Sequence, residues 1–288
     1  QILIRLLEKK KINLTIFYKK KKPKFYGTAN FIKENLLDKK KLDLLFSRVK
    51  PDIIVHLAAN NPSYLQKNYK IFFLENFIAT KNIFYSTFEA NSKAKFIFCS
   101  SSQIFKKKSG LVDEKSQKII TTDYTNFRIK SDAMMLKYKK QKKINYTNAI
   151  LFNHDSKFRN PKFILPRIIN AIIKKNISFL KNIKKANICA DFSHAEDICR
   201  GLLKLMFSKV NLDKLIFSSG KNTSINKIIQ YVVKKNKLNI NINFTENIIK
   251  KSLLGNNTLL KKNLNWSPKK NIYTAANEIY RFCILNLK

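Results

Sequence analysis

Two hydrophobic periods alternate along the first 155 residues. Short, continuous runs of apolar and β-branched residues predict buried strands, at 12–18, 52–59, 95–102 and 147–154. Longer stretches with apolar residues on one side predict helices, at 1–11, 42–46, 71–90 and 125–140. Strands that alternate with helices are typical of a parallel sheet covered by helices on both faces.

The pattern loosens after about residue 160. Helices are predicted at 164–175, 195–207, 224–235 and 273–285, with a short strand at 214–218 and a turn-rich segment at 263–271. We therefore expect a doubly wound α/β fold with two parts. The first part would be residues 1–155, which contain the parallel sheet, and the second part would be a smaller lobe at residues 156–288.

Composition and charge limit the classes of partner that the chain is expected to bind. The net charge is +40, but the lysines occur in short runs in most parts of the chain, alongside only 5 Gly. This distribution favours solvated lysine faces over a nucleic-acid groove, so no specific nucleic-acid partner is expected. The four cysteines form no CxxC pair, and no apolar run is long enough to span a membrane. We expect a cytoplasmic protein without a metal site or a membrane partner.

Candidate chemistry lies where predicted strands end. Ala58 and Ala59 close one strand, and two small residues there let a flat ligand approach the backbone. Ser101 lies at the end of the next strand, and Tyr124 directly precedes the following helix. Two hydroxyls over a dinucleotide crevice can handle a proton while a cofactor takes a hydride. Arg128 follows Tyr124 by four residues on the same helix face, where its charge favours the phenolate.

Several segments together resemble one protein family. They are HLAA at 56–59, NFIATKN at 76–82, FIFCSSSQIF at 96–105 and AILFNHDSKFR at 149–159. The chain resembles the extended short-chain dehydrogenases/reductases of the nucleotide-sugar epimerase/dehydratase family, and most closely the GDP-mannose 4,6-dehydratases. The resemblance implies that residues 1–155 form a Rossmann-type NAD(P)-binding domain, and that residues 156–288 form mainly a substrate-binding lobe that partly returns to the Rossmann sheet. It also implies a nucleotide-sugar substrate, expected to be GDP-mannose, a bound NAD(P) and a homo-oligomer.

The resemblance also implies residue roles. Ser101 would hydrogen-bond the reacting oxygen of the sugar, and Tyr124 would be the base that removes the hydroxyl proton. Further residues fall at the cofactor, namely Asn35, Leu36, Leu57, Ala58, Ala59 and Asn76. Contacts to the nucleotide-sugar would come from Asn153, Arg159 and Arg167.

The segment after the second expected strand bears on the choice of cofactor. Tyr18 is followed by Lys19 and three further lysines, where an acidic residue would favour NAD. Basic residues suit the additional phosphate of NADP, which we expect. The same residues could be one more solvated lysine run, so NAD stays open.

Among the departures from the family pattern, two fall at catalytic positions. Arg128 replaces the usual Lys, and Gln103 replaces the Glu that a dehydratase uses as its elimination base. In addition, alignment places the family's glycine-rich turn just before Gln1. We therefore expect a parallel sheet without its first strand, and weak dinucleotide binding by residues 1–288.

Four functions follow from these observations. The first is a dehydratase of the GDP-mannose type. The second is an epimerase or reductase of the same family, which needs no elimination base. The third is a degenerate homologue without turnover. Nucleic-acid binding through charge alone ranks last.

Overall fold

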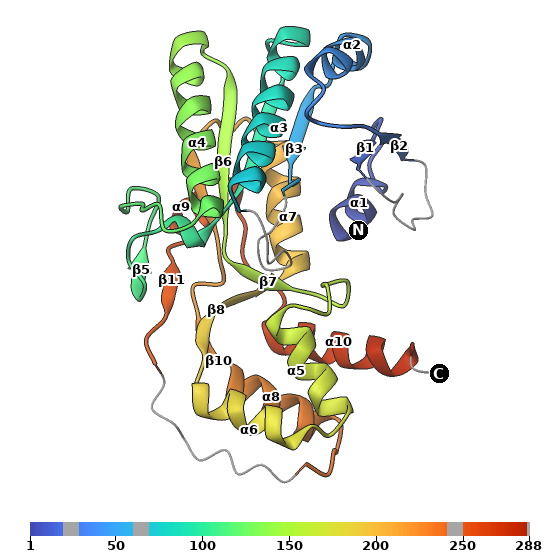
Figure 1. Cartoon of the computed structure of the whole chain (residues 1–288), viewed down its shortest axis with the longest axis vertical. Coiled ribbons are helices and arrows are strands. Elements are labelled where there is room, and N and C mark those ends of the chain that lie inside the picture. Colours follow the sequence, from blue (N-terminus) through green and yellow to red (C-terminus); the bar gives the residue numbers. More distant parts are fainter. Residues whose placement is uncertain (20–28, 60–68, 241–249, 287–288) are drawn as a thin grey trace. The chain divides into compact units, whose positions relative to one another are not determined.

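The computed structural model describes residues 1–19, 29–59, 69–240 and 250–286. The chain divides into two compact units (Figure 1). The first unit comprises Gln1–Ile104, Lys118–Ile150 and Leu202–Leu215, and the second comprises Phe105–Gln117, Leu151–Gly201 and Ile216–Lys288.

Most of a four-stranded sheet lies in the first unit. Its strand order is β3-β4-β6-β9, from β3 (Ile53–His56), β4 (Lys95–Ser101), β6 (Asn145–Leu151) and β9 (Lys214–Phe217). β3 and β4 are parallel, with Ile53 opposite Lys95. Phe96 and Phe98 of β4 have no solvent exposure, as expected of a parallel strand covered on both faces.

A separate two-stranded sheet precedes it in the chain. β1 (Thr15–Tyr18) and β2 (Asn30–Lys33) pair in parallel, with Thr15 opposite Asn30. Among the described residues, β1 pairs with β2 alone and β3 pairs with β4 alone. The parallel strands of the first unit therefore form two pieces. The expected α/β fold with parallel strands is confirmed.

Capping residues mark where two helices of the first unit begin. They are α1 (Ile2–Leu7), α2 (Lys39–Val49), α3 (Tyr69–Ala90) and α4 (Asp123–Lys142). The Asp38 side chain accepts the Lys41 N–H at the start of α2, and Thr122 forms a capping box with Thr125 at the start of α4. α3 and α4 run side by side, and Phe84 meets Tyr138 at 5.5 Å between ring centroids (Figure 1).

The second unit contains two short sheets. β8 (Cys189–His194) lies between antiparallel β10 (Asn222–Ser224) and parallel β7 (Asn153–Asp155), and β5 (Gly110–Val112) pairs with β11 (Leu253–Gly255). Its helices are α5 (Ile164–Ile173), α6 (Ile177–Ala186), α8 (Ile225–Lys235), α9 (Thr258–Leu264) and α10 (Ile272–Leu285). A further helix, α7 (Ala195–Met206), begins in the second unit and ends in the first.

A buried carboxylate organises the second unit. Asp191 of β8 has no solvent exposure and accepts hydrogen bonds from the Ser219 hydroxyl and from the backbone N–H groups of Ser219, Gly220 and Gly255. Gly220 has φ +71°, and a Cβ on Gly255 would lie 2.6 Å from the Ser218 hydroxyl oxygen. Both positions therefore require glycine.

The structure corrects several element boundaries. The predicted strand at 52–59 ends at His56, so the two alanines follow the strand rather than closing it. The predicted helix at 1–11 is shorter, Ile2–Leu7. The sequence pattern missed β2, β5, β8, β10 and β11, together with α6 and α9. The missed strands have only three to six residues, too few to show a period.

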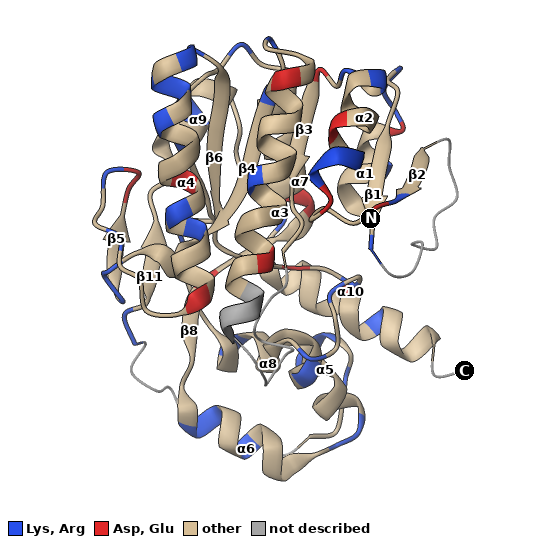
Figure 2. Cartoon of the chain, turned by 45° about the horizontal axis from the view of Figure 1, so that its top comes forward, with Lys and Arg blue, Asp and Glu red and all other residues tan. Residues whose placement is uncertain are grey.

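Lysine and arginine residues are spread over helices of both units (Figure 2). No helix in the described part of the chain is both long enough and apolar enough to cross a bilayer.

Candidate functional site

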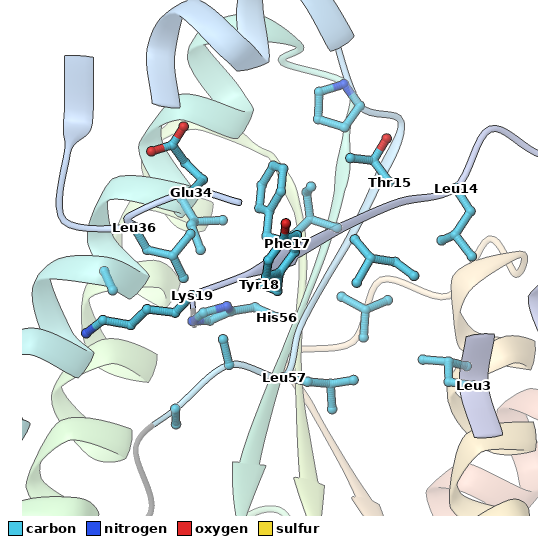
Figure 3. A pocket seen from close by; sticks show the side chains of 18 of the residues that line it. Leu3, Leu14, Thr15, Phe17, Tyr18, Lys19, Glu34, Leu36, His56 and Leu57 are labelled. Carbon is cyan, nitrogen blue, oxygen red and sulfur yellow. The ribbon is translucent and has the colours of Figure 1, made fainter. Parts of the chain in front are cut away.

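A pocket of about 560 Å³ opens in the first unit (Figure 3). Its walls come from α1, β1, β3, the loop after β2 and the first half of α3. The structure brings together in this pocket all seven residues that were predicted to contact the cofactor, namely Lys19, Asn35, Leu36, Leu57, Ala58, Ala59 and Asn76. They come from four separate segments, so their shared location is a property of the fold.

The carboxyl end of β3 forms one rim of the pocket. Leu57 and Ala58 are exposed and Ala59 is half-buried, directly after the buried His56. Small side chains here leave the backbone open to a flat group. The segment NNPSY, which follows the alanines, lies at 60–64 and is outside the described residues.

The segment NFIATKN in α3 supports this rim from behind. Thr80 Oγ1 lies 2.8 Å from His56 Nε2, and Asn82 Nδ2 donates to the carbonyl oxygens of Leu36 and Leu37, each at 3.1 Å. Asn76 lines the pocket itself. Sequence reasoning named only Asn76 from this segment, although the polar residues that recur along an otherwise apolar helix were the available signal.

His56 is a structural residue at the base of the site. Burial, together with the positive charge of Arg128, lowers the pKa of His56 to about 3. The ring lies 6.0 Å from Phe98, centroid to centroid, and is stacked on it. His56 is therefore neutral at physiological pH and fixes the end of β3 to α3.

A charge pair lies at the other rim. Lys19 Nζ is 3.6 Å from a Glu75 carboxylate oxygen, and both residues line the pocket. The Lys19 side chain is 57% exposed, so the pair is largely solvated. Lys20, Lys21 and Lys22 lie outside the described residues. Glu75 was not predicted, and no local pattern marked it.

Ser101 and Tyr124 lie on neighbouring elements of the first unit. Ser101 is the last residue of β4, and its Oγ accepts the Gln103 N–H at 3.3 Å. Gln103 is exposed, in a short 3₁₀ turn of Ser102–Ile104. Tyr124 is half-buried in the first turn of α4.

Arg128 connects these two elements from inside the core. It is 5% exposed, and its Nη1 donates to the Cys99 carbonyl oxygen, two residues before Ser101. The guanidinium carbon lies 5.0 Å from the ring centre of Tyr124 and 4.7 Å from that of Phe127. Arg128 is therefore a buried cation beside Tyr124, enclosed by aromatic rings, with little surface left for a ligand.

The predicted substrate residues belong to the second unit. Asn153 begins β7 and is exposed, while Arg167 lies in α5 with its guanidinium 5.4 Å from the Phe179 ring centre. Arg159 is held on two sides, by Asp155 at 3.3 Å and by the Phe163 ring at 3.4 Å. Burial raises the pKa of Asp155 to about 6 although Arg159 opposes the shift.

The fold and pocket define a class, a Rossmann-type α/β protein with candidate dinucleotide-binding residues at the carboxyl ends of parallel strands. A family profile described as GDP-mannose 4,6 dehydratase matches residues 2–279, and the chain belongs to this family.

Known proteins are similar to the chain at low identity. GDP-mannose 4,6 dehydratase 2 of Caenorhabditis elegans is 22% identical over 277 residues, covering 84% of this chain and 71% of the relative. UDP-glucose 4-epimerase of Thermotoga maritima, solved with UDP-glucose, has a TM-score of 0.80 and 15% identity, covering 99% and 95% of the two chains. RMD from Pseudomonas aeruginosa, complexed with NADPH, has a TM-score of 0.75 and 15% identity, covering 88% of each. These structures support the fold.

Proposed function

We propose that the chain carries the machinery of an NADP-dependent enzyme that transforms a nucleotide-sugar, in the manner of a GDP-mannose 4,6-dehydratase. The observation that carries the proposal is the convergence of all seven predicted cofactor residues in one pocket of the unit that also holds Ser101, Tyr124 and Arg128. Membership in the family supports the same activity class.

The pocket fits a dinucleotide in its chemistry. Leu36, Leu57 and Ala58 offer apolar surface to a flat base, while Asn35 and Asn76 place polar amide groups in the pocket wall. Lys19 would attract a phosphate. Bound NADP would supply the hydride acceptor and donor of the reaction.

Ser101 and Tyr124 would act on the sugar. Tyr124 accepts the proton of the sugar hydroxyl that is oxidised to a ketone, and Ser101 hydrogen-bonds the same oxygen. Arg128 acts as a buried positive charge next to the phenol ring, at 5.0 Å. This role differs from that of a lysine that reaches the ribose, because Arg128 is buried and its guanidinium donates a hydrogen bond to the Cys99 carbonyl oxygen. In the second unit, Asn153, Arg159 and Arg167 would contact the nucleotide-sugar.

The residue at position 103 bears on which reaction of the family the chain could catalyse. Elimination of water needs a base to remove a ring proton, and an amide side chain cannot serve as one. An epimerase or reductase has no such requirement, so these activities are the alternative within the family. A homologue without turnover is the second alternative. A cytoplasmic homo-oligomer stays a prediction.

The test is hydride transfer from nucleotide-sugars. We expect the chain, at high NADP concentration, to turn over GDP-mannose slowly, and Tyr124→Phe to lower the rate on the order of 10² to 10⁴-fold. Ser101→Ala should also lower it. Tyr138→Phe is a matched control, because it removes a phenol from the same helix, one that packs on Phe84. Analysis of the sugar product provides the measurement, because in a dehydratase or an epimerase the hydride taken by the cofactor returns to the sugar and no reduced cofactor accumulates.

Gln103→Glu distinguishes the branches. In a dehydratase that has lost its base, this change should raise the 4-keto-6-deoxy product. In an epimerase or reductase, the product should stay the same. If neither the parent chain nor the variant converts any GDP- or UDP-sugar in the presence of NADP or NAD, the proposed activity is wrong and the homologue without turnover is favoured.

A further inference from the structure

Three lysines and two aspartates of the first unit lie together beside α4. They are Lys118, Lys139, Lys214, Asp132 and Asp213, from the segment before α4, from α4 itself and from the start of β9. None of the five lines the pocket. The proposed cofactor and substrate contacts therefore leave this group of charges without a role.

Both carboxylates of the group already have partners. Asp132 is buried, and its two oxygens accept hydrogen bonds from the Tyr146 hydroxyl and the Lys118 ammonium, each at 2.8 Å. Asp213 pairs with Lys139 at 2.9 Å, and Lys139 also donates to the Tyr146 carbonyl oxygen at 3.0 Å. Three ammonium groups thus share two carboxylates.

Lys214 is the lysine without an ion-pair partner among the described residues. Its ammonium lies close to that of Lys118. Burial lowers the pKa of Lys214 and the charge of Lys118 lowers it as well, while the charges of Asp132 and Asp213 oppose the shift. Compared with a solvated lysine, a larger share of Lys214 is therefore the neutral amine, which is the nucleophilic form.

A second lysine shows that burial alone does not make an amine available. Burial also lowers the pKa of Lys95, but Lys95 is fully enclosed and its Nζ donates to the carbonyl oxygens of Leu205 and Ser208. Lys214, the first residue of β9, is only half-buried. Of these two lysines, only Lys214 combines a lowered pKa with access from solvent.

The charges around Lys214 favour one class of modification. A protonated imine, formed with an aldehyde, would keep the unpaired positive charge, and a carbamate would add a third negative charge. An amide is neutral, so acylation leaves two balanced pairs, Lys118 with Asp132 and Lys139 with Asp213. The net charge of +40 attracts acyl donors that are anions.

We propose that Lys214 is a nucleophilic amine that is acylated by anionic acyl donors, either acyl phosphates or phosphate-bearing thioesters. The Lys214 nitrogen forms a bond to the acyl carbon, and the bond from that carbon to the phosphate oxygen or the thioester sulfur breaks. The leaving group takes the electron pair, and the proton of the amine passes to water. The proposal does not depend on the proposed enzymatic activity.

The test measures acetylation at each lysine by mass spectrometry, after incubation of the chain with acetyl phosphate or, separately, with acetyl-coenzyme A. Near neutral pH, we expect Lys214 to react at least about fivefold faster than Lys140, an exposed lysine of α4. Lys95 should stay unmodified in the folded chain. The donor that reacts faster identifies the source of the acyl group.

Lys118→Gln and Lys118→Arg form a matched pair of variants beside the amine. Glutamine removes the neighbouring charge and frees an oxygen of Asp132 for Lys214, so acetylation of Lys214 should slow at least about threefold. Arginine keeps the charge, so the rate should stay within about twofold of the parent. Because Lys214 itself is unchanged, the difference between the variants reports charge rather than access.

Two results would overturn the proposal. One is acetylation of Lys214 that is no faster than that of Lys140 with either donor. The other is an equal rate in Lys118→Gln and Lys118→Arg, with both variants folded by circular dichroism, because access and not the unpaired charge would then set the rate. The comparison with Lys140 uses the parent chain, so it decides the matter even where a variant does not fold.

Discussion

β3 and β4 are neighbours in one parallel sheet, yet their burial differs. Phe96, Ile97 and Phe98 of β4 have no solvent exposure, whereas Ile53 and Ile54 of β3 are only partly buried. Both strands contain an apolar run, at 53–55 in β3 and at 96–99 in β4. The difference arises because β4 has a paired strand on each side, while β3 has one only on the β4 side among the described residues. Burial of a parallel strand is therefore set by its neighbours as much as by its own composition.

Polar groups also differ between the core around β4 and β6, which we call the centre, and the pocket beside β3, which we call the front. In the centre, the Tyr146 hydroxyl donates to Asp132 at 2.8 Å, and Lys118 pairs with the same carboxylate at 2.8 Å. Burial and the Asp132 charge raise the pKa of Tyr146. At the open front, the pair between Lys19 and Glu75 is longer and solvated. The centre can thus be tested through stability, and the front through binding.

The largest expected effect is in the centre. Phe84 has no exposure and lies within 5.0 and 5.2 Å of the ring centroids of Phe88 and Phe96. We expect Phe84→Ala to lower the free energy of unfolding by about 3–5 kcal/mol. At the front, Leu57→Ala should stay within about 0.5 kcal/mol, because Leu57 is half exposed.

Urea unfolding of the first unit provides the measurement. The single tryptophan, Trp266, belongs to the second unit, so its fluorescence reports the other unit. Far-ultraviolet circular dichroism, combined with hydrogen exchange of β4 amides, should be used instead. Equal costs for Phe84→Ala and Leu57→Ala would show that the contrast between centre and front is wrong.

The sequence was sufficient to predict the elements of the closed centre. The run KFIFCS and the long apolar helix that begins near residue 70 have clear periods, and the structure has β4 and α3 there. Pocket membership of Asn35 and Leu36 was also predicted, but through family resemblance rather than pattern.

Other features depend on contacts between distant residues and were not predictable. The pairing of Lys19 with Glu75 spans 56 positions, from 19 to 75, and the enclosure of Arg128 by Cys99 and Phe98 depends on how α4 packs on β4. The spacing of four residues between Tyr124 and Arg128 predicted that the two side chains share a helix face. It did not indicate whether that face contacts a ligand or the core.

The next effect concerns His56, the buried end of the front strand. Its pKa is about 3 in the folded state and 6.5 ordinarily, so the unfolded chain binds the proton more readily. The free energy of unfolding should therefore fall as the pH drops below about 6.5. At pH 5, protonation of His56 in the unfolded chain should lower it by about 2 kcal/mol.

His56→Gln should remove this dependence, since glutamine can still bond Thr80 but does not titrate between pH 3 and 7. The measurement is the free energy of unfolding of parent and variant at pH 7 and pH 5. The difference between them should shift by about 2 kcal/mol in favour of the variant at pH 5. A constant difference would mean that His56 is not held neutral by the fold.

The smallest effect concerns Lys19 and Glu75 at the rim. Their ion pair is worth about 0–1 kcal/mol, because the Lys19 side chain is 57% exposed and screened. If Lys19 receives the additional phosphate of NADP, the Glu75 carboxylate opposes that phosphate. Glu75→Gln should then tighten NADP binding by roughly two- to fivefold while changing NAD binding less, with the gain shrinking as salt rises.

Glu89→Gln is the matched control, since Glu89 pairs with Lys39 and does not line the pocket. Titration of NADP and NAD at two salt concentrations decides the matter. An equal change for both cofactors would assign Lys19 to general charge attraction, and would leave the front of the pocket without a group that selects NADP.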